Sequence, residues 1–316
     1  MKVRKAVITA AGRGARLYPA ADTVQKSMLP LVDRDGLAKP VIQIIAEEAL
    51  ESGIEEICVV CAPGDETKYR DQLRGLRDNL LSAYKGVEWA RLQARRIDDL
   101  LQRLHFAVQD EPLGYGHSVA CAQEFVGDEP FLLLLNDHLF VSAVSGRRCA
   151  GDLIELAKAE QSAATAVAVM REQLVGHYGT LSGRRLPNLP GVYQIERIIE
   201  KPSISRAELE LLTPGLRVGH YLCLFGMHVL TPAVFEILAA MIRGGERQNG
   251  EVQLTPALHE LAQRGRFLAL EIRGRRYDLG ANLGVLRAQV ALSLAGQDRH
   301  EVLSTLLETL ADSDPA

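Results

Sequence analysis

The sequence predicts an α/β fold with a doubly wound, mostly parallel, Rossmann-like mixed sheet and a smaller antiparallel portion. Apolar strand-like runs alternate with stretches of helical periodicity, which is typical of parallel strands joined by crossover helices. Residues 131–135 are apolar without a break, as a strand covered on both faces requires. Turn residues and alternating apolar positions at 181–202 indicate antiparallel hairpins.

The expected strands are apolar runs bounded by glycine or acidic residues. In chain order they read KAVITAA, EEICVVC, LHFAVQ, PFLLLLND, AATAVAVM and YLCLFGMHVL, at residues 5–11, 55–61, 104–109, 130–137, 163–170 and 221–230. Between the second and third runs, leucines recur among many charges over residues 66–104. This pattern predicts a helical excursion that is longer than a crossover needs.

The end of the chain is expected to form terminal helices from Ala288 onward. Because no internal repeat or second core is evident, we predict one main domain over residues 1–290 and a helical extension over residues 291–316. Leu303, Leu306 and Leu310 give that extension an apolar stripe, which would either support self-association or dock on the domain.

Composition excludes some classes of partner. The 316 residues carry a formal net charge of -4 with acidic and basic residues intermixed, so no broad cationic face for nucleic acid is expected. The longest unbroken apolar run is far shorter than the roughly 20 residues that span a bilayer, and no charged-then-apolar leader opens the chain. We expect a cytoplasmic protein without nucleic-acid or membrane partners.

The five cysteines are interpreted as reduced thiols, most of them in the core. Cys58 and Cys61 form a C-x-x-C pattern inside a strand-like run. Residues three apart on a strand point to opposite faces, so these two sulfurs are poorly placed to share a metal.

The first expected strand leads into a basic, glycine-bearing loop. Gly12 and Gly14 would let backbone N–H groups approach a phosphate, and Arg16 and Lys26 would add charge to that cradle. Leu17 stands where a dinucleotide-binding fingerprint needs its third glycine, and the P-loop signature is absent. The loop therefore favours a phosphate-binding function other than a dehydrogenase or a P-loop kinase.

The loop GRGARLYPAADTVQKSMLP resembles the signature loop of the sugar-1-phosphate nucleotidyltransferases. Further motifs follow in that family's order over most of the chain, namely QDEPLGYGHSVACAQEFVGDEPFLLLLND, HYGTL, IIEKP, NGEVQLTPAL and RRYDLGANLG. Among subfamilies, the chain is most similar to the bacterial UTP-glucose-1-phosphate uridylyltransferases. The resemblance implies a nucleotidyltransferase catalytic domain with an antiparallel sugar-binding portion, and transfer of a uridylyl group from UTP to glucose-1-phosphate. It also implies a homo-oligomer, a dimer or tetramer.

Two aspartates are candidate metal ligands. Asp137 closes an apolar run, which places it at the carboxyl end of a parallel strand, where ligands bind in open α/β sheets. Asp278 lies at a similar strand-to-turn edge. By resemblance, both hold Mg²⁺, a hard ion that prefers oxygen ligands.

The resemblance also implies roles for residues around the cleft. Arg16 and Lys26 neutralise the triphosphate, Lys201 aligns the sugar phosphate, and Glu200 binds sugar hydroxyls. Strand alternation sends Glu200 and Lys201 to opposite faces, although Pro202 would turn the lysine back. The remaining expected substrate contacts are Ala11, Gly12 and Gly14 in the loop, Gln109, Gly114 and Gly116 at the uracil, and Gly179 beside the hexose. We expect no catalytic role for three histidines, which are His117, His138 and His177. A solvated helical face, also without a catalytic role, is expected to carry Tyr69, Arg70, Arg95 and Arg96.

The chain departs from the family pattern at several positions. Gln25 replaces a proline, Ser27 replaces a glutamate that contacts the base, and Asn136 replaces proline or glycine. A turn near the cleft mouth is expected at Arg34, Asp35 and Gly36. Two alternatives follow. One is a pyrophosphorylase for another nucleotide, such as dTTP, or another sugar phosphate. The other is a non-catalytic regulatory paralogue that binds a sugar nucleotide, against which the retained Lys26, Asp137, Lys201 and Asp278 argue.

Overall fold

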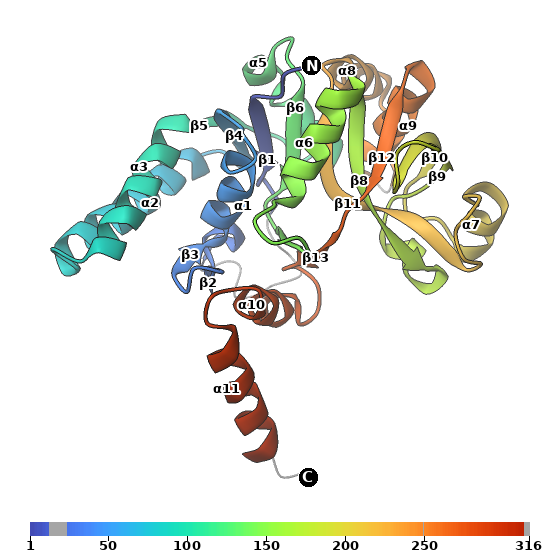
Figure 1. The fold of residues 1–316 in the computed structure, drawn as a ribbon. Coiled ribbons are helices and arrows are strands. Elements are labelled where there is room, and N and C mark those ends of the chain that lie inside the picture. Colours follow the sequence, from blue (N-terminus) through green and yellow to red (C-terminus); the bar gives the residue numbers. More distant parts are fainter. Residues whose placement is uncertain (13–23, 249, 313–316) are drawn as a thin grey trace.

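A nine-stranded mixed sheet forms the centre of the molecule in the computed structural model, which describes residues 1–12, 24–248 and 250–312 (Figure 1). The strand order is β5-β4-β1-β6-β11-β8-β12-β10-β9. The strands are, in that order, Leu104–Val108, Glu56–Cys61, Lys5–Thr9, Phe131–Leu135, His220–Leu230, Ala163–Arg171, Phe267–Glu271, Val192–Ile199 and Thr180–Arg185.

Strand direction confirms the predicted α/β class. β5, β4, β1 and β6 are mutually parallel, and β12 is parallel to β8. The expected hairpin over residues 181–202 is the antiparallel pair β9–β10. The sequence analysis missed β12 and two short antiparallel pairs outside the main sheet. These pairs are β2–β3, Pro30–Val32 with Ala38–Pro40, and β7–β13, His138–Ser142 with Gly274–Asp278.

Alternate residues of the central strands enter two separate cores, one on each face of the sheet. Ile8 and Leu134 belong to one core, whereas Val7 and Leu133 belong to the other. Both faces are therefore apolar, which explains the continuous apolar runs. Cys58 and Cys61 fall in opposite cores, as strand alternation predicts, and all five cysteines are free thiols.

Helices cover both cores (Figure 1). The Ile8 core is packed by α1 (Val41–Leu50), α2 (Asp65–Ala83), α3 (Glu88–Arg103), α6 (Cys149–Glu160) and α10 (Gly284–Leu294). The Val7 core is packed by α4 (Tyr115–Ala120), α5 (Gln123–Val126), α8 (Ala233–Gly244) and α9 (Leu254–Arg264). A third, small cluster lies against α7 (Ile204–Glu210) and η4 (Glu172–His177).

Two helical features extend from this body. The excursion predicted at residues 66–104 is a pair of packed helices, α2 and α3, that projects beyond edge strand β5 (Figure 1). α11 (Arg299–Asp312) follows α10, points away from the sheet, and has no buried residue (Figure 1). Terminal helices are thus present as expected, although α10 begins at Gly284, slightly before the expected start.

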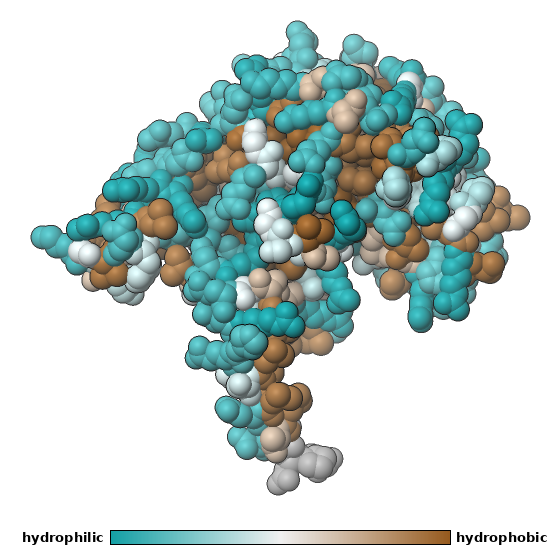
Figure 2. Space-filling view, in the orientation of Figure 1, coloured by the Kyte–Doolittle hydropathy of each residue, from teal (hydrophilic) through white to brown (hydrophobic). Residues whose placement is uncertain are grey.

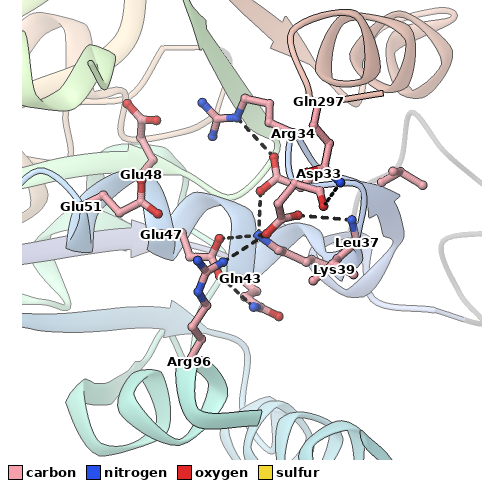
Figure 3. A network of polar contacts seen from close by, with 12 residues as sticks. Asp33, Arg34, Leu37, Lys39, Gln43, Glu47, Glu48, Glu51, Arg96 and Gln297 are labelled. Carbon is pink, nitrogen blue, oxygen red and sulfur yellow. Dashed lines mark hydrogen bonds and ion pairs between the residues drawn. The ribbon is translucent and has the colours of Figure 1, made fainter. Parts of the chain in front are cut away.

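A buried polar network fixes the β2–β3 hairpin (Figure 3). Lys39 is 2% exposed, and its Nζ lies 2.9 Å from Asp33, 2.7 Å from Asp35 and 2.8 Å from Glu47. Burial opposes the charge of Lys39, but the carboxylates of Glu47 and Asp33 outweigh that effect and raise its pKa. Arg96 of α3 pairs with Asp35 at 3.1 Å, so the network ties the hairpin to α1 and α3.

The hairpin turn is where the sequence predicted it. Gly36 has φ +75° and donates its N–H to Asp33 O, which closes the turn. Gln297, between α10 and α11, donates two hydrogen bonds to this turn. Its backbone N–H binds Arg34 O at 2.9 Å, and its side-chain Nε2 binds Asp35 O at 2.9 Å. Arg34 lines a cavity with residues of α6, and none of Arg34, Asp35 and Gly36 lines the cavity that contains Lys26.

Glu48 of α1 lies beside this network with its carboxylate buried (Figure 3). It accepts the Ala150 N–H at 2.9 Å at the start of α6, and Arg148 Nη1 lies 3.5 Å from its other oxygen. Burial raises the pKa of Glu48 to about 7, and the hydrogen bond from Ala150 only partly opposes this rise. The carboxyl is therefore protonated in the folded chain at acidic pH.

Glu48→Gln should flatten the pH dependence of stability. Because folding raises this pKa, the carboxyl stabilises the protein fully below the unfolded pKa and loses that contribution as pH rises towards 7. Between pH 5 and pH 8 we expect wild type to lose about 2 kcal/mol more of its unfolding free energy than the variant. Urea denaturation at both pH values measures this, with Glu124→Gln at an exposed position as control. Equal losses in wild type and Glu48→Gln would contradict the assignment.

Candidate active site

The carboxyl ends of the parallel strands bring several predicted site segments to one edge of the sheet. Ala10, after β1, donates its N–H to Val60 O of β4 at 2.7 Å. Asn136, after β6, donates to Thr9 O of β1 at 3.2 Å, and Gln109, after β5, donates to Cys61 O at 2.9 Å. The loops that follow these strands therefore begin side by side, where open α/β sheets bind ligands.

The two candidate metal ligands meet at this edge although they are far apart in the sequence. In the β7–β13 pair, Asp278 lies opposite His138, and Leu279 donates its N–H to Asp137 O at 2.9 Å. Ligand atoms of Asp137, His138 and Asp278 all lie within 4.8 Å of one another. Two carboxylates and an imidazole thus form one compact group of potential ligands.

The ring of His138, one member of this group, is buried. Burial lowers its pKa to about 4, so the ring is neutral at physiological pH and adds no charge beside the aspartates. Gly226, with φ +81°, makes room for the ring, because a Cβ there would collide with His138 Nδ1. The enclosed ring supports a structural role. His177, by contrast, is exposed at the end of η4.

Lys26 joins the loop after β1 to the end of β6. It begins the short 3-10 helix η3 (Lys26–Met28), and its Nζ lies 2.5 Å from Asp137 Oδ2. The next residue, Ser27, accepts a hydrogen bond from Asn136 Nδ2 at 3.2 Å. Two consecutive residues of η3 therefore bind two consecutive residues after β6, which fixes their register.

Tyr69 was expected on a solvated helical face, and this expectation is wrong. It is 2% exposed, and its hydroxyl lies 2.7 Å from Ser27 Oγ. Burial raises its pKa to about 12, so the phenol stays protonated and can donate to Ser27. The sequence did contain the signal, because Tyr69, Leu73, Leu76 and Leu80 have helical spacing and form the apolar stripe of α2.

The neighbouring arginines on these helices follow the expectation only in part. Arg70 donates to Leu104 O at 3.1 Å, and its guanidinium lies 4.9 Å from the centre of the Phe106 ring. It thus fastens α2 to β5 instead of extending into solvent. Arg95 is exposed as expected, whereas Arg96 is exposed but engaged with Asp35.

A cavity of about 320 Å³ opens between the ends of β1, β4 and β6 and the start of α2. Ala11 and Gly12, two of the predicted substrate contacts, line it together with Lys26. Gly14 and Arg16 lie outside the described residues. The remaining lining residues are Ala10, Gln25, Ser27, Ala62, Asp65, Lys68, Tyr69 and Asn136.

Gln109 and the glycines that follow it are engaged within the protein. Gln109 is 7% exposed, and its Nε2 lies 3.2 Å from Gly114 O and 3.0 Å from His117 Nδ1. A Cβ at Gly114 or Gly116 would lie within 2.9 Å of Val252 O. The close approach of the chain at residues 251–253 is therefore sufficient to require glycine at both positions.

Glu200, Lys201 and Gly179 form a second polar group. Thr255 donates to Glu200 Oε2 at 2.5 Å, and a Cβ at Gly179 would lie 3.2 Å from the same oxygen. Lys201 has φ +42°, which breaks the strand alternation and returns its Nζ to within 3.6 Å of Glu200 Oε1. The lysine thus lies beside the glutamate, and its side chain is half exposed.

Tyr115 begins α4, and the sequence analysis assigned it no role. Burial raises the pKa of its phenol, and the carboxylates of Asp137 and Glu200 both add to the rise. The hydroxyl is therefore within electrostatic reach of the aspartate group and of the Glu200 group. Tyr115 stands between Gly114 and Gly116, which the sequence analysis did assign to the uracil, so the motif marked the segment but not the tyrosine.

Comparison with known proteins matches residues 5–291 to the family described as nucleotidyl transferase. UTP–glucose-1-phosphate uridylyltransferase YngB of Bacillus subtilis is 36% identical, over 98% of this chain and 95% of its own. A UDP-glucose pyrophosphorylase solved in complex with UDP-glucose has a TM-score of 0.73 and 28% identity, over 92% of this chain and 98% of its own. UTP-bound UGPase from Acinetobacter baumannii has a TM-score of 0.76 and 27% identity, over 97% of this chain and 99% of its own.

Tyr69→Phe should lower the unfolding free energy by about 1 kcal/mol, because it removes a buried hydrogen bond to Ser27. Urea denaturation checks this. Tyr84→Phe, at a tyrosine that is 49% exposed at the end of the same helix, is the matched control. If Tyr69→Phe lowers the unfolding free energy by no more than about 0.5 kcal/mol, as is normal at an exposed position, the buried placement of Tyr69 is contradicted.

Proposed function

This chain belongs to the nucleotidyl transferase family, and we propose that it transfers a uridylyl group from UTP to glucose-1-phosphate, releasing UDP-glucose and pyrophosphate. The observation that carries this proposal is the group formed by Lys26, Asp137 and Asp278 at the carboxyl edge of the parallel strands. It combines the cation and the carboxylates that phosphoryl transfer requires. The names of the relatives, which act on UTP and glucose-1-phosphate, support the choice of substrates.

Asp137 and Asp278 would hold a Mg²⁺ ion. Their carboxylate oxygens suit this hard ion, and the neutral ring of His138 leaves the negative charge of the group undiminished. When bound, the ion offsets the negative charge of the triphosphate. The positive charge of Lys26 offsets the negative charge of Asp137, so the two aspartates can lie this close together.

The reaction needs positioning rather than a side-chain nucleophile. An oxygen of the sugar phosphate, already ionised at neutral pH, attacks the α-phosphorus of UTP, and pyrophosphate leaves in line. Lys26 and Arg16 neutralise the phosphates, and the backbone of Ala11, Gly12 and Gly14 approaches them closely. Lys201 orients the sugar phosphate. Contacts to the rest of the substrates come from Glu200 and Gly179 at the hexose and from Gln109, Gly114 and Gly116 at the uracil.

Pyrophosphate release across a grid of substrates tests this function. The grid combines UTP, dTTP, ATP, CTP and GTP with glucose-1-phosphate, galactose-1-phosphate and N-acetylglucosamine-1-phosphate, in the presence of Mg²⁺. We expect a clear preference for UTP with glucose-1-phosphate. A preference for dTTP or for another sugar would establish a pyrophosphorylase of different specificity, and silence across the grid from folded protein would favour the regulatory paralogue.

A second copy of this chain is the proposed protein partner. α11 has no buried residue, and it exposes Leu303, Leu307 and Leu310. Figure 2 shows hydrophobic surface along the projecting helix. Burial of this stripe against the same helix of another copy would remove apolar surface from water. UTP and glucose-1-phosphate are cytoplasmic metabolites, so we place the protein in the cytoplasm. Within the described ranges, no helix combines the length and hydropathy that a membrane span needs.

Asp137→Asn should reduce turnover at least about a hundredfold, because it removes a negative charge from the proposed Mg²⁺ site while it keeps the shape of the side chain. Steady-state pyrophosphate release at several Mg²⁺ concentrations measures this. Asp128→Asn, at an exposed loop position, is the matched control. Near-normal turnover of Asp137→Asn in Mg²⁺ would refute the metal assignment.

Replacement of Leu307 and Leu310 by glutamate should convert a dimer or tetramer into a monomer, because the apolar stripe of α11 would become charged. Light scattering coupled to size exclusion measures the mass. Leu209→Glu, at an 86% exposed position on α7, is the control and should keep the wild-type mass. A wild-type monomer, or an unchanged mass in the double variant, would contradict the proposed interface.

A further inference from the structure

A single hydrogen bond holds the carboxylate of Glu200. Thr255 donates its hydroxyl to Glu200 Oε2 at 2.5 Å, and among the described residues no other group donates to this carboxylate. The second oxygen, Oε1, lies 3.6 Å from Lys201 Nζ, which is an ion pair but too long for a hydrogen bond. One oxygen of Glu200 is therefore fixed within the protein, and the other can still accept a hydrogen bond.

Glu200 needs such an anchor because it lies just past the end of a strand. β10 ends at Ile199, and the chain turns at Lys201, whose φ is +42°. A glutamate side chain has several rotatable bonds, so an unpartnered carboxylate at this turn would occupy several positions. The bond from Thr255 selects one of them.

Thr255 offers its hydroxyl from a rigid element. It follows Leu254, the first residue of α9, and that helix packs into the Val7 core through Leu254 and Leu258. Inside a helix, a threonine hydroxyl often bonds to the carbonyl one turn earlier. In the first turn of α9 the hydroxyl of Thr255 bonds to Glu200 instead, and the positive end of the helix dipole also favours a carboxylate there.

Gly179 lies against this pair. A Cβ at position 179 would lie 3.2 Å from Glu200 Oε2 and 3.2 Å from Thr255 Oγ1, so a side chain there would press on both partners. The pair nevertheless borders open space, because Glu200 and Thr255 both line a cavity of about 210 Å³ and the Glu200 side chain is 18% exposed. A ligand can therefore reach the carboxylate that Thr255 holds.

We propose that Thr255 is a positioning residue, which orients Glu200 towards the hexose of glucose-1-phosphate and of UDP-glucose. The inference rests on the proposed function, because it takes these sugars as the occupants. While Thr255 holds Oε2, Glu200 Oε1 accepts a hydrogen bond from a hexose hydroxyl at a fixed position. Thr255 acts through Glu200, so its removal weakens the binding of the sugar and leaves the binding of the nucleotide unchanged.

Thr255→Val tests this role, because valine keeps the branched shape of threonine and lacks the hydroxyl. We expect KM for glucose-1-phosphate to rise about tenfold, since a hydrogen bond to a charged group is lost. The values of kcat and of KM for UTP should change little. Thr255→Ser keeps the hydroxyl and should restore most of the wild-type KM for glucose-1-phosphate.

Calorimetric titration with UDP-glucose and with UDP separates the hexose from the nucleotide without turnover. Thr255→Val should bind UDP-glucose about tenfold more weakly and UDP as wild type does, because UDP has no hexose. Thr213→Val is the matched control and should keep both affinities. Thr213 is 7% exposed, against 6% for Thr255, and its hydroxyl accepts the Gly183 N–H at 3.3 Å. Equal weakening of UDP and UDP-glucose in Thr255→Val would overturn the inference.

A double variant tests whether Thr255 acts through Glu200. Glu200→Ala should itself weaken UDP-glucose relative to UDP, and Thr255→Val added to it should cause no further loss, because the two residues form one unit. A further loss of about tenfold in the double variant would show that Thr255 acts independently of Glu200, which contradicts the inference.

The outcomes separate the inference from the proposed function. If wild type makes UDP-glucose from UTP and glucose-1-phosphate, but Thr255→Val keeps the wild-type KM and affinities, the function stands and the inference is wrong. The same holds if Glu200→Ala binds UDP-glucose as wild type does. If wild type neither binds UDP-glucose nor releases pyrophosphate from UTP and glucose-1-phosphate, both are overturned.

Discussion

The buried ion pair between Lys26 and Asp137 is the constraint on which the candidate site depends. Its atoms lie 2.5 Å apart, and both side chains are largely shielded from water, so neither charge would be stable there alone. The pair holds the chain after β1 against the end of β6, and the Ser27–Asn136 hydrogen bond repeats the connection one residue further on. Tyr69 then adds α2 to this connection. This junction places the cation beside the aspartate group and brings Lys26 and Ser27 to the wall of the cavity.

Much of the fold could be predicted because its signal is local. A central strand buried on both faces must be apolar at nearly every position, so the runs that became β1, β4, β6, β8 and β11 were evident in the sequence. β12 was missed because its run FLALE is only five residues long and only Gly265 and Arg266 separate it from α9. Asp137 could be placed by its position after β6, whereas its proximity to Asp278 depends on the pairing of β7 with β13, which no local pattern encodes.

What the sequence analysis did not reveal at the site has a common physical cause. Tyr69 lies among charged residues, and these concealed that it belongs to the apolar stripe of α2. Its hydroxyl contacts Ser27 of η3. Gly114 and Gly116 stay predicted contacts of the base, and the chain at residues 251–253 gives a second reason for glycine there that the sequence did not reveal. Ser27 and Asn136 were noted as separate departures, yet they are hydrogen-bond partners. In each case the deciding contact joins segments that are distant in sequence, so residue type alone could not reveal it.

A crystal structure of the protein with UTP and Mn²⁺, which scatters anomalously and substitutes for Mg²⁺, tests the central claim most directly. The claim is that one junction at the carboxyl edge of the sheet holds both the metal and the nucleotide. The account predicts an anomalous peak bound by the carboxylates of Asp137 and Asp278, and UTP in the cavity that Gln25 and Lys26 line. A peak away from both aspartates, or UTP bound outside that cavity, would contradict it.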